Sequence, residues 1–263
     1  MVRGQNQRVN KTGNNPEVAK ATFGVFYFCV RKGGDGLNPE KEVACSWSSG
    51  KDSCLALYKA IQKGYKISYL VNFISGEHKR VSFHGAKADL VELQAEAIGI
   101  PLLQRETTQS NYEEVFKKTL VELKERNIWH LVRGDIHLLD LRDWVEDICG
   151  SENIKVISPI WNKPNEDILK EFITSGFKAV IACVQADKLD QGWVGRVIDE
   201  SFLCDLKKIE GVDLCGENGE YHSFVYDGPI FNKRIEITQC QKVLINGFWF
   251  LDIQKYKIKD RRK

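Results

Sequence analysis

The sequence predicts an α/β fold in which helices cover both faces of a parallel sheet. From residue 43 onward, short apolar runs of strand character alternate with segments whose apolar residues recur at helical spacing. Strands that are separated by helices pair in parallel, and such sheets are covered on both faces. The 263 residues are enough for one large or two small domains with a sizeable core.

The alternation is regular up to residue 184. We expect strands at residues 43–47, 67–74, 102–105, 128–132 and 179–184. The expected helices are residues 54–61, 87–98, 112–126, a segment through Leu141 and Ile148, and residues 167–174. The first two helices are expected to end at Gly64 and Gly99, and Pro101 also prevents the second helix from continuing.

Residues 48–53 (SSGKDS) are the most informative stretch, because a predicted strand precedes them and a predicted helix follows them. A tight loop at this junction directs backbone N–H groups and a helix N-terminus toward one point, which suits an anion such as phosphate. Gly50 lets the backbone approach that ligand closely. The loop therefore predicts a nucleotide held by its phosphates, with a capped helix and no ligand as the alternative.

The loop is not a kinase-type P-loop. The pattern G-x-x-x-x-G-K-[ST] needs Gly in place of Cys45 and Ser or Thr in place of Asp52. The acid at position 52 needs its own explanation. Its carboxylate could cap the helix, or it could hold Mg²⁺ against a triphosphate.

The sequence pattern changes after residues 159–164, and we expect a domain boundary there. We expect residues 41–162 to form a nucleotide-binding domain and residues 163–254 a smaller α+β domain on the substrate side. In the second domain, Asn246-Gly247 separates two strand-like runs and predicts a hairpin. Residues 1–40 are expected to be a partly disordered extension, and residues 255–263 a basic tail.

Composition argues against several classes of protein. Net charge is +2, but the last nine residues carry +5 and the first twenty +3, which leaves −6 for the body, so no nucleic-acid surface is expected. The eight cysteines include no C-x-x-C pair, which argues against zinc, iron–sulfur and disulfide frameworks. The apolar run at residues 21–30 is too short to span a bilayer. We expect a cytoplasmic protein without membrane attachment.

A second dense motif lies at residues 216–229 (GENGEYHSFVYDGP). Glu217, Glu220 and His222 place two acids and an imidazole within six residues, between glycines. Such a set could ligate a metal, bind a cationic group or perform acid–base chemistry. The spacing alone fits two interpretations equally well: one of these roles, or a turn whose polar side chains only form hydrogen bonds with one another.

The two motifs together resemble those of a known enzyme family. Residues 48–53 are similar to the SGGxDS pyrophosphate loop of the ATP pyrophosphatases, with Ser49 where that family usually has Gly. Serine fits there if the residue does not need a positive φ. Over residues 42–235 the chain resembles the diphthine–ammonia ligase-like proteins of that group in residues 48–53, Ser82-Phe83-His84-Gly85, Gly134-Asp135-Ile136, Asp140, Arg142, Trp144, Pro159-Ile160-Trp161 and Gly216–Phe231. Ser223 stands where members often have Thr.

The resemblance implies a ligase that forms an amide at the expense of ATP. The enzyme would adenylate the diphthine carboxylate of elongation factor 2, and ammonia would displace AMP to give diphthamide. ATP and Mg²⁺ are the implied cofactors, ammonium is the second substrate, and a homo-oligomer is left open. The implied ATP-binding residues are Ser48, Ser49, Gly50, Lys51, Asp52, Ser53 and Asp135, with Asp52 also as the metal ligand. The implied catalytic residues are Asp52, Glu217, Glu220 and His222.

Alternatives stay open for individual residues and for the whole protein. Asp135 could cap a helix instead, and Arg142 could pair with Asp140 or Glu146 rather than bind an anion. His84 is as well explained by a structural role. A tRNA-modifying ATP pyrophosphatase would share the fold but would favour a basic RNA-binding surface. A non-catalytic ATP-binding regulatory protein would tolerate Ser49, yet would have little use for the second motif.

Overall fold

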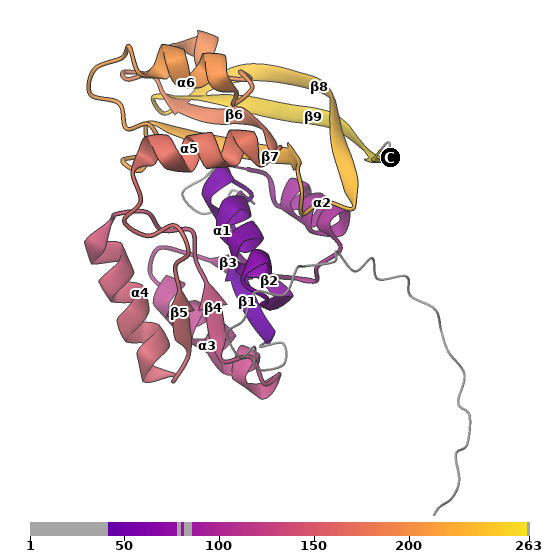
Figure 1. The fold of residues 1–263 in the computed structure, drawn as a ribbon, viewed down its shortest axis with the longest axis vertical. Coiled ribbons are helices and arrows are strands. Elements are labelled where there is room, and N and C mark those ends of the chain that lie inside the picture. Colours follow the sequence, from indigo (N-terminus) through magenta and orange to yellow (C-terminus); the bar gives the residue numbers. More distant parts are fainter. Residues whose placement is uncertain (1–41, 78–79, 82–85, 262–263) are drawn as a thin grey trace, which may run out of the picture. The chain divides into compact units, whose positions relative to one another are not determined.

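A computed structural model describes residues 42–77, 80–81 and 86–261 (Figure 1). The predictions for the extension at residues 1–40 and for Ser82-Phe83-His84-Gly85 lie outside the described residues. None of the helices in the described ranges is both long enough and apolar enough to cross a bilayer.

The first sheet confirms the predicted α/β architecture. Its five strands are all parallel and lie in the order β3-β2-β1-β4-β5. They are β1 (Glu42–Ser46), β2 (Lys66–Ser75), β3 (Leu102–Thr107), β4 (His130–Val132) and β5 (Lys155–Ile157). The connecting helices are α1 (Lys51–Gln62), α2 (Ala88–Ile98), α3 (Tyr112–Glu125) and α4 (Leu139–Ser151). The three-residue β5 was not predicted, because so short a strand gives no readable alternation.

The second sheet has four antiparallel strands in the order β7-β6-β9-β8. They are β6 (Lys178–Gln185), β7 (Tyr221–Asp227), β8 (Lys233–Ile245) and β9 (Phe248–Asp260), accompanied by α5 (Asn165–Thr174), the short 3₁₀ helix η1 (Gln191–Trp193) and α6 (Glu200–Leu206). The predicted hairpin is confirmed, because Asn246 and Gly247 have φ of 49° and 80° between β8 and β9.

Two predictions about this sheet are wrong. The strand at residues 179–184 was counted with the parallel sheet, but β6 lies between the antiparallel neighbours β7 and β9. A fully buried strand gives the same continuous apolar run in either kind of sheet. Residues 255–260 were assigned to a basic tail, but they complete β9 and pair with β8. Their lysines alternate with Tyr256 and Ile258, which is the pattern of a half-buried strand.

The elements stack in layers around two cores. Helices α1 and α2 lie between the two sheets, and their apolar side chains join those of the second sheet in one core (Figure 1). Leu55 and Leu57 of α1 belong to this core together with Phe177 and Phe224. Helices α3 and α4 cover the opposite face of the parallel sheet and form a separate core with it. The sandwiched position of α1 brings the second sheet close to the N-terminus of that helix.

The side chain of Gln94 joins α2 to both sheets. It is fully buried, and its Oε1 accepts a hydrogen bond from Trp47 Nε1 at 2.7 Å. Its Nε2 donates to the carbonyls of Ser49 at 3.1 Å and Val225 at 2.6 Å. Buried polar groups of this kind are stable only when paired. One amide thus connects the end of β1, the loop after it and β7.

We expect Gln94→Leu to lower the free energy of unfolding by about 2–4 kcal/mol, because it leaves a buried indole N–H and two carbonyls with fewer partners. Urea unfolding measures the change. Gln62→Leu, at an exposed position of α1, is the control and should stay within about 0.5 kcal/mol of the wild type. Equal stability of both variants would contradict a structural role for the Gln94 amide.

Candidate active site

The candidate site lies at the carboxyl edge of the parallel sheet. Strand order reverses between β1 and β4, and ligands of open α/β sheets bind outside the strand ends at such a point. The loop after β1 and the loop after β4 meet there. A Cβ built on Gly134 would lie 2.7 Å from the carbonyl carbon of Asp52, so only glycine allows this contact between the backbones.

A cavity of about 1170 Å³ opens at this edge and extends to the second sheet. Eight of the ten predicted site residues line it: Ser48, Gly50, Lys51, Asp52, Ser53, Asp135, Glu217 and His222. Ser49 and Glu220 do not. The two sequence motifs, more than 160 residues apart, therefore contribute to one site.

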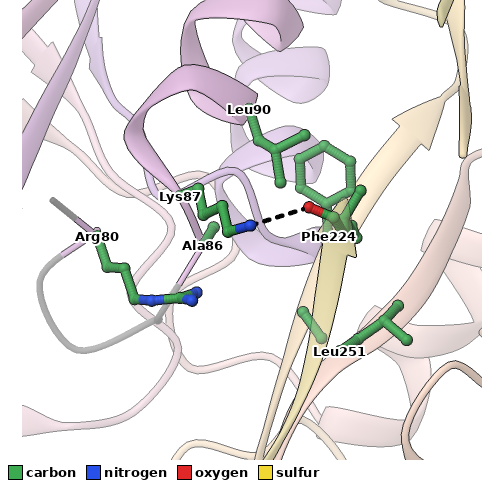
Figure 2. A pocket seen from close by; sticks show the side chains of 8 residues that line it. Arg80, Ala86, Lys87, Leu90, Phe224 and Leu251 are labelled. Carbon is green, nitrogen blue, oxygen red and sulfur yellow. Dashed lines mark hydrogen bonds between the residues drawn. The ribbon is translucent and has the colours of Figure 1, made fainter. Parts of the chain in front are cut away.

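A second, much smaller cavity of about 10 Å³ lies between α2 and the second sheet (Figure 2). Lys87 extends across it and donates to the carbonyl of Ile253 at 3.1 Å (Figure 2). Its Nζ also pairs with Asp252 at 2.8 Å. A volume of this size holds about one water molecule. It is a packing gap rather than a ligand site.

The loop after β1 is organised by its own serines. Ser48 Oγ donates to Ser53 Oγ at 3.2 Å and accepts from the N–H of Gly50 at 3.4 Å, while Ser53 Oγ is also 3.0 Å from the carbonyl of Gly50. Gly50 is the N-cap residue of α1 and has no side chain to cover the helix end. The positive end of the helix dipole therefore faces the cavity, as anion binding requires.

Ser49 has a positive φ, the one condition under which serine was expected to fit poorly at this position. Its φ is 72°, in the left-handed region that favours glycine. Its carbonyl accepts hydrogen bonds from Gln94 Nε2 and from the N–H of Val225, both at 3.1 Å. Its hydroxyl is buried, and no residue in the described part of the chain forms a hydrogen bond with it. The surroundings thus hold the loop in this conformation despite the cost of a side chain at this position.

Lys51 directs its charge toward the second domain. The residue is 3% exposed, and its Nζ donates to Asp52 Oδ2 at 2.9 Å and to the carbonyl of Cys215, and lies 5.0 Å from the Tyr221 ring centre. Its backbone N–H donates to Ser223 Oγ at 3.0 Å. Burial alone would lower the pKa of Lys51, but the attraction of Asp52 raises it above its ordinary value. Lys51 is therefore a charged link between the loop and the second motif.

Asp52 presents one carboxylate oxygen that its neighbours leave open. Oδ2 pairs with Lys51, whereas Oδ1 is buried and has no hydrogen-bond partner among the described residues. Burial raises the pKa of Asp52, and Lys51 opposes this shift. The described residues contain no cluster of three metal-ligating side chains, but Mg²⁺ commonly takes one or two carboxylates together with phosphate and water. An open, buried carboxylate oxygen beside a phosphate loop fits that ion.

Asp135 forms an ion pair with Arg133, a residue that was not predicted to belong to the site. Arg133 Nε and Nη2 donate to its two oxygens at 2.6 and 2.8 Å, in a bidentate pair. It does not cap α4, whose N-cap residue is Leu138. Arg133 also lines the cavity, and its position directly after a strand at the carboxyl edge was the available signal. Arg142 pairs with Glu146 at 2.6 Å, as the simpler alternative held, and does not line the cavity.

The two acids of the second motif have different roles: Glu220 holds its loop in shape, and Glu217 lines the cavity. Glu220 is 3% exposed, and its carboxylate accepts hydrogen bonds from the N–H groups of Asp213 at 2.9 Å and Asn218 at 3.1 Å. It therefore shapes the loop that carries Glu217. Burial, followed by the negative charge of Asp52, raises the pKa of Glu217 to about 7.

His222 lies on β7 and lines the cavity. Burial, together with the positive charge of Lys51, lowers its pKa to about 4. The imidazole is therefore neutral at pH 7, and it can orient a substrate group but cannot supply a positive charge.

An aromatic wall of the cavity also escaped the sequence analysis. It consists of Phe73, Tyr112 and Trp144, with ring centres 5.3 Å apart for the first pair and 6.0 Å for Tyr112 and Trp144. Each of these residues reads as a core residue in the periodicity of its own element. Only the fold places the three rings along one side of a polar cavity, where they offer an apolar surface to a ligand.

We expect Ser49→Gly to raise the free energy of unfolding by about 1 kcal/mol, because glycine adopts φ of 72° without a Cβ penalty. Ser49→Ala removes the buried hydroxyl but keeps the Cβ, so it should remain less stable than the glycine variant. Urea unfolding of the three proteins measures both differences. A glycine variant less stable than the wild type would show that the loop does not need this conformation.

The raised pKa of Glu217 predicts a dependence of stability on pH. The carboxyl keeps its proton up to about pH 7 in the folded protein, whereas its ordinary pKa is 4.5. The unfolded chain releases the proton first, so this residue lowers stability as pH rises from about 4.5 to 7. The increase in Tm on Glu217→Gln should therefore be larger at pH 8 than at pH 5. Glu210→Gln, at an exposed position, is the control; a gain independent of pH would contradict the shift.

The chain is similar to known proteins over most of its length. Residues 41–156 match the diphthamide synthase N-terminal domain, and residues 164–260 match the diphthamide synthase C-terminal domain. The chain is 32% identical to the diphthine–ammonia ligase of Mus musculus, with 77% of this chain and 85% of that protein covered. It is 31% identical to the rat (Rattus norvegicus) ligase and 29% identical to the human one, with the same shares covered. Because the two domain matches cover most of its length, the chain belongs to the diphthamide synthase family.

Proposed function

We propose that this protein is an ATP-dependent ligase of diphthamide biosynthesis, which amidates the diphthine carboxylate of elongation factor 2. The observation that carries the proposal is one cavity that joins the phosphate loop, the open Oδ1 of Asp52 and the half-buried Glu217. A volume of about 1170 Å³ exceeds that of most small-molecule sites, and a nucleotide and an acceptor side chain need such room together.

The ATP-binding role rests on the loop after β1. The N-terminus of α1 offers hydrogen bonds to the terminal phosphates, and the hydroxyls of Ser48 and Ser53 would turn from their bonds within the loop to donate to them as well. The aromatic wall at Tyr112 and Trp144 offers a stacking surface for the adenine ring. Mg²⁺, when bound, would offset phosphate charge, and Asp52 is the residue that would hold it.

The chemistry requires two steps, the first at the α-phosphorus of ATP and the second at the carboxyl carbon of diphthine. A carboxylate oxygen of diphthine attacks the α-phosphorus of ATP, and the bond to the β-phosphate breaks to release pyrophosphate. Ammonia then attacks the carboxyl carbon of the acyl-adenylate, and AMP leaves. This order makes a poor electrophile reactive, because AMP is a far better leaving group than oxide.

The attacking nitrogen must first lose a proton, since ammonium has no lone pair. Glu217 is suited to accept it, because its pKa of about 7 leaves a large fraction of the carboxylate ionised at neutral pH and still basic. The neighbouring negative charges of Asp52 and Asp135 favour a cation at this place. We assign Glu217 to ammonium binding and proton removal, and neutral His222 to orientation of the acceptor.

The same proposal places the protein in the cytoplasm. All seven cysteines in the described part of the chain are free thiols, five of them buried. Free thiols of this kind are usual where the surroundings are reducing.

Analysis of nucleotide products tests the function. The full chain is given ATP, Mg²⁺ and ammonium, with and without elongation factor 2 that carries diphthine. We expect AMP only when the factor is present, and a loss of about 100-fold or more with Asp52→Ala. Asp147→Ala, at an exposed position of α4, is the matched control and should keep its activity. Removal of Mg²⁺ by a chelator should abolish AMP formation, and added Mg²⁺ should restore it.

Other outcomes separate the alternatives. AMP formed with tRNA but not with the factor would keep an ATP pyrophosphatase and replace the acceptor. Tight ATP binding without AMP in either mixture would favour a regulatory protein instead.

A further inference from the structure

The β8–β9 hairpin carries an apolar strip that begins inside the cavity. Phe248 lines the cavity and pairs with Ile245, and Phe250 pairs with Val243. Residues directly opposite each other in antiparallel strands share a face, and every second residue along a strand returns to that face. The four side chains therefore lie on the same face of the hairpin. The rings of Phe248 and Phe250 are 6.3 Å apart, so the strip is continuous along β9.

The hairpin tip is fixed in position by the rest of the second domain. The N–H of Ala186 donates to the carbonyl of Gly247 at 2.9 Å, and Lys242 Nζ donates to the carbonyl of Gln191 at 2.9 Å. Phe248 also pairs with Gln185 of β6, which lines the cavity as well. A fixed apolar surface loses little conformational freedom when a partner covers it.

Ile245 is the exposed end of this strip. It is 47% exposed although its strand partner is Phe248, whereas its neighbour Leu244 is 54% exposed on the opposite face, across from Trp249. Single exposed apolar residues are common on protein surfaces. Ile245 differs from them because its face leads without interruption into the cavity.

We propose that the strip of Val243, Ile245, Phe248 and Phe250 is the surface on which the acceptor protein docks while its modified side chain enters the cavity. The inference rests on the proposed function, since a side chain that belongs to a folded protein brings the surrounding surface of that protein against the rim. The strip runs from the rim into the cavity without a break, so the acceptor protein can rest on it while its modified side chain reaches the reaction site. The partner patch beside the modified side chain should accordingly be apolar.

The test compares two neighbouring substitutions on the same strand. The dissociation constant of the full chain for elongation factor 2 carrying diphthine is measured by calorimetry. We expect Ile245→Ser to weaken binding about tenfold or more, because it replaces an apolar side chain that the partner would cover with a polar one. Leu244→Ser, the control on the opposite face, should stay within about twofold. ATP affinity should be unchanged in both variants, and kcat at saturating acceptor should also be retained.

Several results would overturn the proposal. These are equal effects of the two substitutions, an unchanged affinity with Ile245→Ser, or a wild type that does not bind the factor. Loss of self-association in Ile245→Ser, seen by sedimentation, would assign the strip to a second copy of the chain instead. Should Ile245→Ser alter ATP affinity through the hairpin, Ile245→Val replaces it and should weaken factor binding about threefold. A wild type that binds the factor but forms no AMP would refute the proposed function and leave the docking surface standing.

Discussion

The carbonyl of Ser49 is the contact on which the site depends. It accepts hydrogen bonds from Gln94 of α2 and from Val225 of β7, so the loop after β1 is held from two directions. Ser49 has the left-handed conformation in this arrangement, and the hydroxyls of Ser48 and Ser53 are hydrogen-bonded to each other in the same loop. A loop that binds phosphate must have its N–H groups already aligned, because reorganisation during binding would cost affinity. The fold therefore sustains a strained residue to keep the loop in place.

Charge in the cavity is arranged so that its cations are already engaged. Lys51 is bound to Asp52 and the Cys215 carbonyl, and Arg133 is bound to both oxygens of Asp135. These pairs leave Asp52 Oδ1 and Glu217 as the acidic groups with remaining capacity. Burial raises the pKa of both residues, and the negative charge of Asp52 raises that of Glu217 further. The site is thus suited to attract small cations, while helix dipole and hydroxyls meet the phosphates.

The two domains build this site jointly. Lys51 N–H donates to Ser223 Oγ across 172 residues of sequence, and the Tyr221 ring lies beside the Lys51 ammonium. The second sheet also supplies His222 and the rim at Phe248, and the loop before β7 supplies Glu217. Nucleotide chemistry and acceptor recognition are therefore coupled through packed contacts around α1 rather than through separate modules.

Three features could be predicted from the sequence alone: the parallel sheet, the strand–loop–helix around residues 48–53 and the hairpin at Asn246-Gly247. Each depends on short-range periodicity or on the backbone freedom of one or two residues. Tertiary structure alone decided that Glu217 faces the cavity while Glu220 braces the loop, that Arg133 pairs with Asp135, and that β6 pairs with antiparallel neighbours. Such outcomes depend on strand register and on partners distant in sequence, and residue type at one position does not encode either. The positive φ of Ser49 is of the same kind, because its reason lies in Gln94 and Val225 and not in the loop itself.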